Sequence, residues 1–402
     1  MRRVVITGAG TVNALGHTVP STLNAMKEGV CGIGPLEIQD IDRLSIRIGG
    51  QIKNFDAKRL FNRQKVTLYD RFTQFTLVAA KEAIEQSGLN FSDEISERSG
   101  VVLGTAGGGV NTWDDNYKSV YEDGKNRVHP FVVPKLMNNA AASHVCIEHN
   151  IKGPSFTISS ACASSNHAMA QAFMMVRSGS ARVMVTGGSE SMLCFGGIKA
   201  WEGLRVMSHD ACRPFSATRN GMVQGEGAGV FVFEELEHAK SRGAPILCEI
   251  AGSGMSSDAG DIVKPSKNGA ARAMVGALKD AGIQADDVGY INAHGTGTRV
   301  NDQVECAAIK DVFGSHSDRL LVSSTKSMHG HLIGGTGAVE LLACIMALQD
   351  GVIAPTLGYE EHDPECALDV VPNQARDAKI SVALSNSFAF GGMNAVLALR
   401  KV

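Results

Sequence analysis

Short apolar runs that end at glycine alternate along the chain with longer stretches in which apolar residues recur at helical spacing. Residues 2–10 predict a first strand and its turn, and residues 181–190 predict another strand. Residues 76–89 place apolar side chains on one helical face and stop at Ser-Gly, so they predict an amphipathic helix. This alternation predicts an α/β fold.

The second half of the chain repeats the order of elements in the first half. In the first half, residues 76–89 predict a helix and residues 99–109 predict a strand that runs into a glycine loop. Residues 154–179 then predict a strand, a sharp turn and a long helix, and residues 181–190 predict a further strand. The second half predicts the same order at residues 269–283, 287–298, 324–351 and 380–392. Coincidental alternation is the alternative, but the repeat favours an internal duplication with a boundary near 245–250. We therefore expect two related halves, residues 1–245 and 246–402, packed face to face.

Loops that follow equivalent strands of a duplicated α/β fold meet around one cleft. The residues that these loops would bring together are Cys162, His294, Lys326, His331 and Phe390. A cysteine or histidine taken alone is more often a structural residue. The expectation of a shared site therefore rests on the repeat.

Composition and charge exclude several classes of partner. The 402 residues include 44% hydrophobic and 20% charged residues and carry a formal charge of −3, so neither nucleic acid nor an anionic membrane is expected to bind. No run approaches the ~20 apolar residues of a membrane span, and the apolar stretch after the two N-terminal arginines is too short for a signal peptide. The nine cysteines are odd in number and lack C-x-x-C spacing, which favours free thiols in a cytoplasmic protein.

Cys162 stands where an apolar strand ends and a long helix begins, among the small residues of 159–165. An isolated cysteine in an apolar sequence is usually inert and buried. At a helix N-terminus, however, unpaired backbone N–H groups favour the thiolate, and the pKa of such a thiol can fall from ~8.5 to roughly 3.5–7.5. This setting favours a nucleophile.

Two histidines stand within glycine-rich segments of the second half. His294 lies within 292–298, where glycines would let a substrate approach the backbone, and Thr296 and Thr298 would donate hydroxyl hydrogen bonds to an amide-bearing arm. His331 lies at the start of a helix.

Metal and dinucleotide binding are both poorly supported. His329 and His331 would suit a metal, but no third ligand stands at suitable spacing. Residues 7–16 begin like a dinucleotide-binding loop but lack the third glycine at the required place. We expect no metal and no bound nucleotide cofactor.

With Cys162, His294, Lys326, His331 and the glycine pair after Phe390 in this order, the sequence resembles the ketoacyl-acyl-carrier-protein synthases of the Cys-His-His type II class. The resemblance covers nearly the whole chain and extends to condensing enzymes of polyketide pathways and to nodulation-type synthases. It implies a thiolase-like duplicated αβαβα five-layer core and a homodimer. It also implies an acyltransferase that elongates fatty acids by decarboxylative Claisen condensation of malonyl-acyl carrier protein.

The resemblance implies a role for each motif residue. Cys162 would hold the acyl chain as a thioester, and the backbone N–H groups of Cys162 and Phe390 would form an oxyanion hole of the kind that a tight Gly-rich loop supplies. His294 and His331 would bind the malonyl thioester oxygen as neutral donors. Phe390 would also gate the acyl pocket.

Further residues are implied as support or as substrate contacts. Lys326 would support the histidines, with Glu340 and Asp302 as its charge partners. The phosphopantetheine arm of acyl carrier protein would pass near Thr296 and Thr298, and no resident cofactor is implied. Substrate-binding residues would be Thr296, Thr298, Gly107, Val132, Phe390 and Gly391.

The sequence departs from the family pattern at five positions. His329 replaces the usual threonine, and Ala389 and Met393 replace a usual glycine and threonine, which alters the surroundings of the second histidine and of the gate. Gly107 and Val132 replace a bulky isoleucine and a phenylalanine. Because both of these changes remove volume, we hypothesise a pocket for unusually long or substituted acyl chains, which Gly107→Ile would shorten.

Three other readings remain to be weighed. A specialised synthase of a polyketide, nodulation-lipid or very-long-chain pathway would use the same chemistry. A non-catalytic chain-length partner subunit usually lacks the cysteine that is present here, and a degradative thiolase needs a second cysteine, whereas Cys366 stands outside the last glycine loop.

Acyl carrier protein is acidic, so Arg205, Arg63 and Lys65 are candidate contacts near the cleft mouth.

Overall fold

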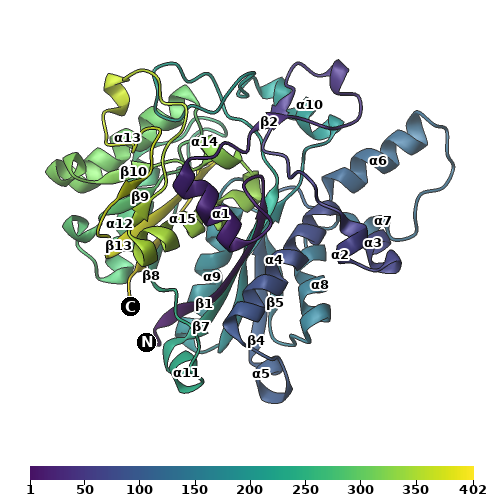
Figure 1. The fold of residues 1–402 in the computed structure, drawn as a ribbon, viewed down its shortest axis with the longest axis horizontal. Helices are drawn as coiled ribbons and strands as arrows, with labels where there is room; N and C mark the ends of the chain where they lie inside the picture. The colour runs from purple at the N-terminus through teal and green to yellow at the C-terminus, as the bar shows by residue number, and fades with distance from the viewer.

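The fold is built on one mixed sheet of ten strands in the order β10-β9-β13-β14-β8-β1-β7-β6-β4-β5 (Figure 1). The computed structural model describes the backbone of residues 1–402 and every side chain but that of residue 93. The strands of this sheet are β1 Val4–Asn13, β4 Ser99–Gly104, β5 Ser155–Ile158, β6 Val183–Glu190, β7 Gly227–Glu235, β8 Cys248–Ser257, β9 Tyr290–Asn292, β10 Leu321–Ser323, β13 Val382–Ala389 and β14 Met393–Arg400.

The sheet consists of two halves with the same internal arrangement. In the first half β4 pairs in parallel with β5 and β6, and β7 pairs antiparallel with β6 and β1. In the second half β9 pairs in parallel with β10 and β13, and β14 pairs antiparallel with β13 and β8. The halves join where β1 pairs antiparallel with β8, residues 4–6 against residues 248–250. This repeat confirms the predicted duplication.

Helices lie between the two half-sheets and on their outer faces. Apolar side chains of α9 and α15 form a middle layer and pack with residues of both half-sheets in one core cluster. α4 and α8 cover the outer face of the first half, and α12 and α13 cover that of the second (Figure 1). The bounds are α4 Arg71–Ser87, α8 Ala140–His149, α9 Ser164–Ser178, α12 Lys267–Ala281, α13 Arg299–Phe313 and α15 Thr336–Asp350. The five-layer αβαβα core expected from the sequence is therefore confirmed.

The middle layer explains the most apolar helix of the chain. Residues Ile333–Asp350 are long and apolar enough to cross a membrane by length and composition, with a mean hydropathy of 1.2, yet 89% of this segment is buried inside the protein. A helix between two sheets has no solvent-facing side, so it is apolar all round. The core thus accounts for this stretch.

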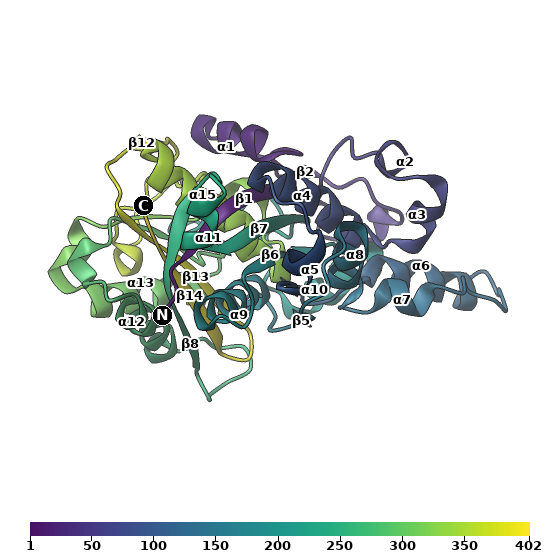
Figure 2. The ribbon, with the colours of Figure 1, turned by 90° about the horizontal axis from the view of Figure 1, so that it is seen from below.

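The remaining helices and short strands lie outside the five-layer core. α6 and α7 form an arm that projects from the first half (Figures 1 and 2). These elements are α1 Val19–Glu28, β2 Gly34–Pro35, β3 Ile48–Gly49, α2 Ala57–Leu60, α3 Arg63–Leu68, α5 Asp93–Glu97, α6 Val110–Tyr121, α7 Val132–Leu136, α10 Phe195–Leu204, α11 Leu236–Ser241, α14 Lys326–His329, β11 Val352–Ile353 and β12 Arg376–Asp377.

One glycine run was misinterpreted from the sequence. Residues 2–10 were expected to end in a turn, but β1 continues through both of its glycines. A Cβ at Gly8 would lie 1.9 Å from the carbonyl oxygen of Ala83, and a Cβ at Gly10 would lie 1.9 Å from that of Ala79. These glycines therefore allow α4 to pack directly on the strand, which is a requirement for close approach rather than for a turn.

Candidate active site

Cys162 lies in a tight turn between β5 and α9 and is 6% exposed. The preceding residue, Ala161, has a φ of 49°, which is the left-handed region that non-glycine residues rarely adopt. Ser164 closes the turn: its hydroxyl accepts from the N–H of Ser160 at 2.9 Å and donates to the carbonyl of Ala161 at 2.7 Å. The small residues of this segment let the chain turn sharply and present the sulfur to a cavity.

The protonation state of Cys162 differs from the expectation. Burial raises the pKa of the thiol to about 12, and this effect outweighs the ammonium of Lys326 and the backbone N–H groups of Phe390 and Cys162, which lower it. Desolvation disfavours the charged form of any acid. The predicted lowering of this pKa was therefore wrong, and the thiol must give up a proton as it attacks.

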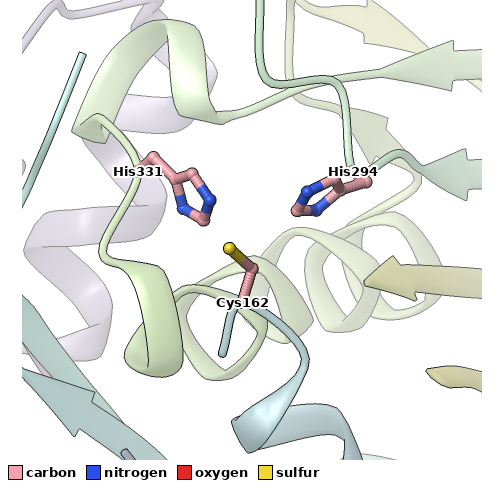
Figure 3. Close-up of side chains that lie close together, drawn as sticks. All are labelled: Cys162, His294 and His331. Carbon is pink, nitrogen blue, oxygen red and sulfur yellow. The ribbon is translucent and has the colours of Figure 1, made fainter. Parts of the chain in front are cut away.

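Two imidazoles face the sulfur. The rings of His294 and His331 are nearly perpendicular, at 83°, with centroids 5.5 Å apart. The sulfur of Cys162 and one nitrogen of each ring all lie within 4.8 Å of one another, and Figure 3 shows both rings directed toward the sulfur. The structure thus brings together a thiol from the first half of the chain and two imidazoles from the second.

His331 is held as a neutral ring with its proton on Nε2. The backbone N–H of Ile333 donates to Nδ1 at 3.1 Å, so Nδ1 is an acceptor, and the hydroxyl of Thr336 lies 2.8 Å from the same atom. Burial, the Lys326 ammonium and His329 lower the pKa of His331 well below its ordinary value. A neutral ring whose Nδ1 accepts must carry its proton on Nε2.

His294 is positioned through its backbone. The N–H groups of His294 and Gly295 donate to the two oxygens of Glu305 at 2.8 and 2.7 Å. Burial, the Lys326 ammonium and His331 lower the pKa of His294 well below its ordinary value. Among the described residues, Nδ1 of His294 has no hydrogen-bond partner. Sequence reasoning missed Glu305, because a carboxylate that accepts backbone N–H groups leaves no motif.

Lys326 and Glu340 form a fully buried ion pair, with Nζ donating to Oε1 at 2.5 Å. Burial raises the pKa of Glu340 to about 7 although the ammonium opposes this. The expectation that Asp302 also pairs with Lys326 was wrong. Asp302 accepts from the N–H of Phe215 at 2.9 Å and lies 3.8 Å from Nε of Arg219. It also accepts from the N–H of Gly297 at 3.3 Å, and it therefore supports the loop that carries the predicted threonines.

The glycine loop after β13 places Phe390 over the sulfur. The N–H of Phe390 acts on the Cys162 sulfur, and the Phe390 ring stacks on Trp201 of α10 with centroids 6.0 Å apart. Gly391 has a φ of 81°, and its N–H donates to the carbonyl of Ile262 at 2.8 Å. Gly391 thus shapes the turn, and its N–H is not free to bind a substrate.

A cavity of about 350 Å³ leads to these groups. The cysteine, both histidines, both predicted threonines, Ala389 and Phe390 line this cavity. Three basic residues, Arg205, Lys264 and Arg299, line its mouth. Only Arg205 was anticipated from the sequence, because single lysines and arginines in loops are ordinary. Further lining residues are Trp201, Val206, Asn220, Gly221, Met222, Val263, Pro265, Val300, Asn301 and Phe388.

The other proposed carrier contacts lie elsewhere. Arg63 and Lys65 belong to α3, which both views place at the opposite end of the molecule from α13 and its Arg299 (Figures 1 and 2). Neither lines the cavity, and Lys65 pairs with Glu148. Their predicted place at the mouth of this cavity was therefore wrong.

The departures from the family pattern have structural consequences. His329 is buried, with Nδ1 2.7 Å from the Gly330 carbonyl and Nε2 3.0 Å from the Thr325 hydroxyl. Burial lowers the pKa of His329 to about 3. Met393 is partly exposed at the start of β14.

The volume expected at Gly107 is not empty. A Cβ there would lie 2.1 Å from Cε of Met192 and 2.8 Å from Cγ2 of Val110, so neighbouring side chains fill the space. Val132 lies on α7 of the projecting arm and does not line the cavity. The hypothesis of an enlarged pocket was therefore wrong for this chain at Gly107.

Acyl transfer through a thioester suits this arrangement, since the thiol can hold an acyl group while the imidazoles face a second substrate. Combined with the duplicated αβαβα fold, it defines a thiolase-like condensing enzyme. Residues 1–239 match the beta-ketoacyl synthase N-terminal domain and residues 247–360 match the beta-ketoacyl synthase C-terminal domain. The chain belongs to the beta-ketoacyl synthase family.

Relatives and solved structures agree. Nodulation protein E of Rhizobium leguminosarum bv. trifolii is 48% identical over 100% of both chains. The 3-oxoacyl-[acyl-carrier-protein] synthase 2 of Staphylococcus aureus (strain N315) is 42% identical over 100% of this chain and 98% of the relative. The ishigamide ketosynthase/chain length factor structure has a TM-score of 0.95 at 32% identity, covering 100% of this chain and 99% of that one. A type II PKS acyl-carrier protein in complex with its ketosynthase matches with a TM-score of 0.90 at 31% identity, covering 100% and 99%.

The predicted activity class is confirmed by these matches. The chain is a condensing enzyme of the acyltransferase class, related to the 3-oxoacyl-acyl-carrier-protein synthases along its full length.

Proposed function

We propose that Cys162 takes an acyl chain from acyl carrier protein and that the chain is then lengthened with malonyl-acyl carrier protein. The observation that carries this proposal is the meeting of the Cys162 sulfur with the neutral rings of His294 and His331 in one buried cavity. The thiol suits covalent acyl transfer. The rings suit an enolate oxygen, which needs donors that are not themselves anionic.

In the first step the Cys162 sulfur attacks the thioester carbon of the acyl-carrier substrate. A sulfur–carbon bond forms to Cys162, the bond to the phosphopantetheine sulfur breaks, and that sulfur leaves with the proton given up by Cys162. The backbone N–H groups of Cys162 and Phe390 stabilise the tetrahedral oxyanion. Both groups already point toward the Cys162 sulfur, since both lower the pKa of its thiol.

In the second step malonyl-carrier substrate loses carbon dioxide, and the electron pair of the broken carbon–carbon bond forms an enolate. Nε2–H of His331 and the ring of His294 stabilise its oxygen; a donor of this kind is typically worth about 3–4 kcal/mol of barrier. The enolate carbon attacks the thioester on Cys162, the sulfur–carbon bond breaks, and the cysteine leaves as a thiolate that takes its proton from solvent water. The product is a β-ketoacyl chain on the carrier.

We propose that this chemistry needs no metal or resident cofactor. Thiol and imidazole are also zinc ligands, but the Lys326 ammonium acts electrostatically on both rings and on the sulfur. A second cation beside it would be repelled. The cofactor of the reaction arrives instead as the arm of the carrier protein.

The acyl carrier protein would dock over the cavity mouth. Arg205, Lys264 and Arg299 line this mouth, so it offers positive charge to an acidic partner. Thr296 and Thr298 lie inside the mouth, with their hydroxyls 2.8 Å apart, where they can meet the amide groups of the arm. The free cysteines and the use of a carrier protein also fit a cytoplasmic location, where carrier protein and reduced thiols occur together.

A specialised lipid pathway is the second candidate for the substrate. Four nodulation protein E sequences are 44–48% identical to this chain, whereas the synthase 2 sequences are 41–42% identical. This difference favours a nodulation-type role over general fatty-acid elongation. The presence of Cys162 with both histidines argues against a non-catalytic chain-length subunit.

The proposal is tested by incubating the protein with acyl-carrier proteins and measuring its mass. Acylation is expected on Cys162 and is lost in Cys162→Ala, while Cys146→Ala, a half-buried cysteine on α8, retains it. Addition of malonyl-carrier protein should then release a β-ketoacyl product. Acylation elsewhere, or none in the wild-type protein, would contradict the proposal.

A further inference from the structure

A further buried carboxylate lies near the active site and has no role in the chemistry proposed above. Glu190 ends β6 and is fully buried, and each of its two oxygens accepts two hydrogen bonds. Oε1 accepts from the hydroxyl of Thr105 at 2.9 Å and from the N–H of Gly107 at 3.2 Å. Oε2 accepts from the N–H groups of Ala106 and Gly334 at 2.7 and 3.1 Å. Glu190 thus connects the loop after β4, in the first half, with a segment of the second half.

These hydrogen bonds fit the ionised form of Glu190. Burial raises the pKa of this carboxyl to about 7, and its four donors oppose the rise. An ionised carboxylate only accepts, whereas a protonated one has a hydrogen of its own to donate. Because all four neighbouring groups are donors, Glu190 holds both segments as a carboxylate above neutral pH.

The segment of the second half is the turn η4 Ile333–Gly335, shortly after the second active-site histidine. Ile333 has a φ of 48°, a left-handed value that a β-branched residue rarely adopts. Such strain persists only where the surroundings fix it. Both polar backbone groups of Gly334 bind the first half: its N–H donates to Glu190, and its carbonyl accepts from the hydroxyl of Ser165. These two bonds therefore hold the turn in its strained form.

The turn decides which nitrogen of His331 carries the proton. Nδ1 of His331 lies 2.8 Å from the hydroxyl of Thr336 and 3.1 Å from the backbone nitrogen of Ile333. A hydroxyl can donate or accept, so Thr336 alone would suit either tautomer of the ring. A backbone N–H only donates, so Ile333 requires Nδ1 to be unprotonated. The hydrogen bond at one ring nitrogen thereby fixes the proton on the other, Nε2.

We propose that Glu190 is a positioning residue for the second step, because it holds the turn that keeps the proton of His331 on Nε2. The inference rests on the proposed function, in which this Nε2–H donates to the enolate oxygen. The two steps should depend on Glu190 in different ways. Burial is the main cause of the raised pKa of the Cys162 thiol, and the negative charge of Glu190 raises it further. Loss of this charge should therefore not slow acylation of Cys162.

The test measures the two steps separately in Glu190→Gln. Glutamine has the same shape, but its NH2 group cannot accept from the N–H groups that the second oxygen meets. Carbon dioxide release from malonyl-carrier protein should slow by at least about tenfold, and at most by the roughly 1000-fold typical of a missing oxyanion donor. Acylation of Cys162, followed by mass spectrometry, should keep its rate or become faster. Equal slowing of both steps would overturn the proposal, since it would show a general loss of structure.

The proton of His331 is observed directly by nitrogen NMR of protein labelled at histidine. The signals of this ring are those that disappear in His331→Ala. The wild-type protein should show an unprotonated Nδ1 and a protonated Nε2, and Glu190→Gln should show a mixture of both tautomers. An unchanged spectrum would overturn the role of Glu190 and leave the proposed function intact. A wild-type protein that neither acylates Cys162 nor releases carbon dioxide would overturn the proposed function, whereas the spectrum reports on the positioning alone.

Glu82→Gln is the matched control. Glu82 is half-buried on α4 and also accepts two backbone N–H groups, at 2.7 and 2.9 Å, so its replacement should leave both steps and the His331 spectrum unchanged. Ser165→Ala tests the same turn if Glu190→Gln does not fold, because it releases the carbonyl of Gly334 and keeps the carboxylate. It should slow carbon dioxide release less than Glu190→Gln does. A normal rate and a normal spectrum in Ser165→Ala would contradict the proposed control of His331 by this turn.

Discussion

At the scale of single residues, the chemistry depends on two imidazoles that stay neutral. Burial makes the largest contribution to their lowered pKa, and the ammonium of Lys326 makes the next. Lys326→Met removes this charge, so the pKa of both rings rises and a larger fraction is protonated at any given pH. The acid limb of the pH profile for malonyl decarboxylation should therefore move to higher pH.

This shift is measured by following carbon dioxide release from malonyl-carrier protein between acid and neutral pH. Lys152→Met, which replaces an exposed lysine before β5, is the control and should leave the profile in place. A Lys326→Met enzyme that is slower at every pH, with an unmoved acid limb, would show that the lysine acts only structurally. The companion Glu340→Gln removes the unpaired carboxylate that Lys326→Met leaves buried.

The residue scale also shows what motifs can and cannot predict. Cys162, His294 and His331 were identified because few other side chains supply a nucleophile or a neutral donor, and the structure brings the three together. Glu305 and Asp302 instead accept backbone N–H groups from loops. Which N–H group a carboxylate meets depends on the fold, so one of these residues was missed and the other was given the wrong partner.

At the scale of elements, close packing of α4 on β1 depends on glycine. Gly10→Ala would place a Cβ 1.9 Å from the carbonyl oxygen of Ala79, which is backbone and cannot rotate away. Overpacking of this kind typically costs about 1–3 kcal/mol, occasionally more, so urea unfolding should show a lower midpoint. Gly34→Ala is the control, because nothing lies within 4 Å of a Cβ built there, and equal midpoints for the two variants would contradict this account.

The same scale explains why strands and helices were predicted better than their ends. The periods of apolar residues identified α4, α9, α12 and α15, since these helices each bury at least one face. The interior glycines of β1 look like a turn in sequence, because close approach of a neighbouring helix and a tight turn call for the same residue. The raised pKa of Cys162 has a similar origin: a helix N-terminus is visible in sequence, whereas the depth of burial is not.

At the scale of the whole molecule, we expect two copies to associate through β5 and the arm. β5 is the edge strand of the sheet, and such edges tend to pair. The arm exposes large apolar side chains, among them Tyr121, Phe131 and Val133. Val133→Asp, at a residue 61% exposed on α7, should weaken the dimer in sedimentation experiments.

The control for this experiment is Val275→Asp, at a residue 50% exposed on α12. α12 covers the outer face of the other half, so this change should leave the sedimentation coefficient unaltered. A wild-type protein that sediments as a monomer at micromolar concentration would contradict the dimer. The internal duplication itself was predictable, because each half carries its own copy of the same pattern.

The backbone ladder between the two halves is short: residues 4–6 of β1 face residues 248–250 of β8. The sulfur comes from one side of this seam and the rings from the other. The distance between the sulfur and the rings consequently depends on how α9 and α15 pack between the two half-sheets. Turnover therefore reports on the fit of the protein interior, and a change in those helices that touches no reacting atom will slow the reaction before it unfolds the chain.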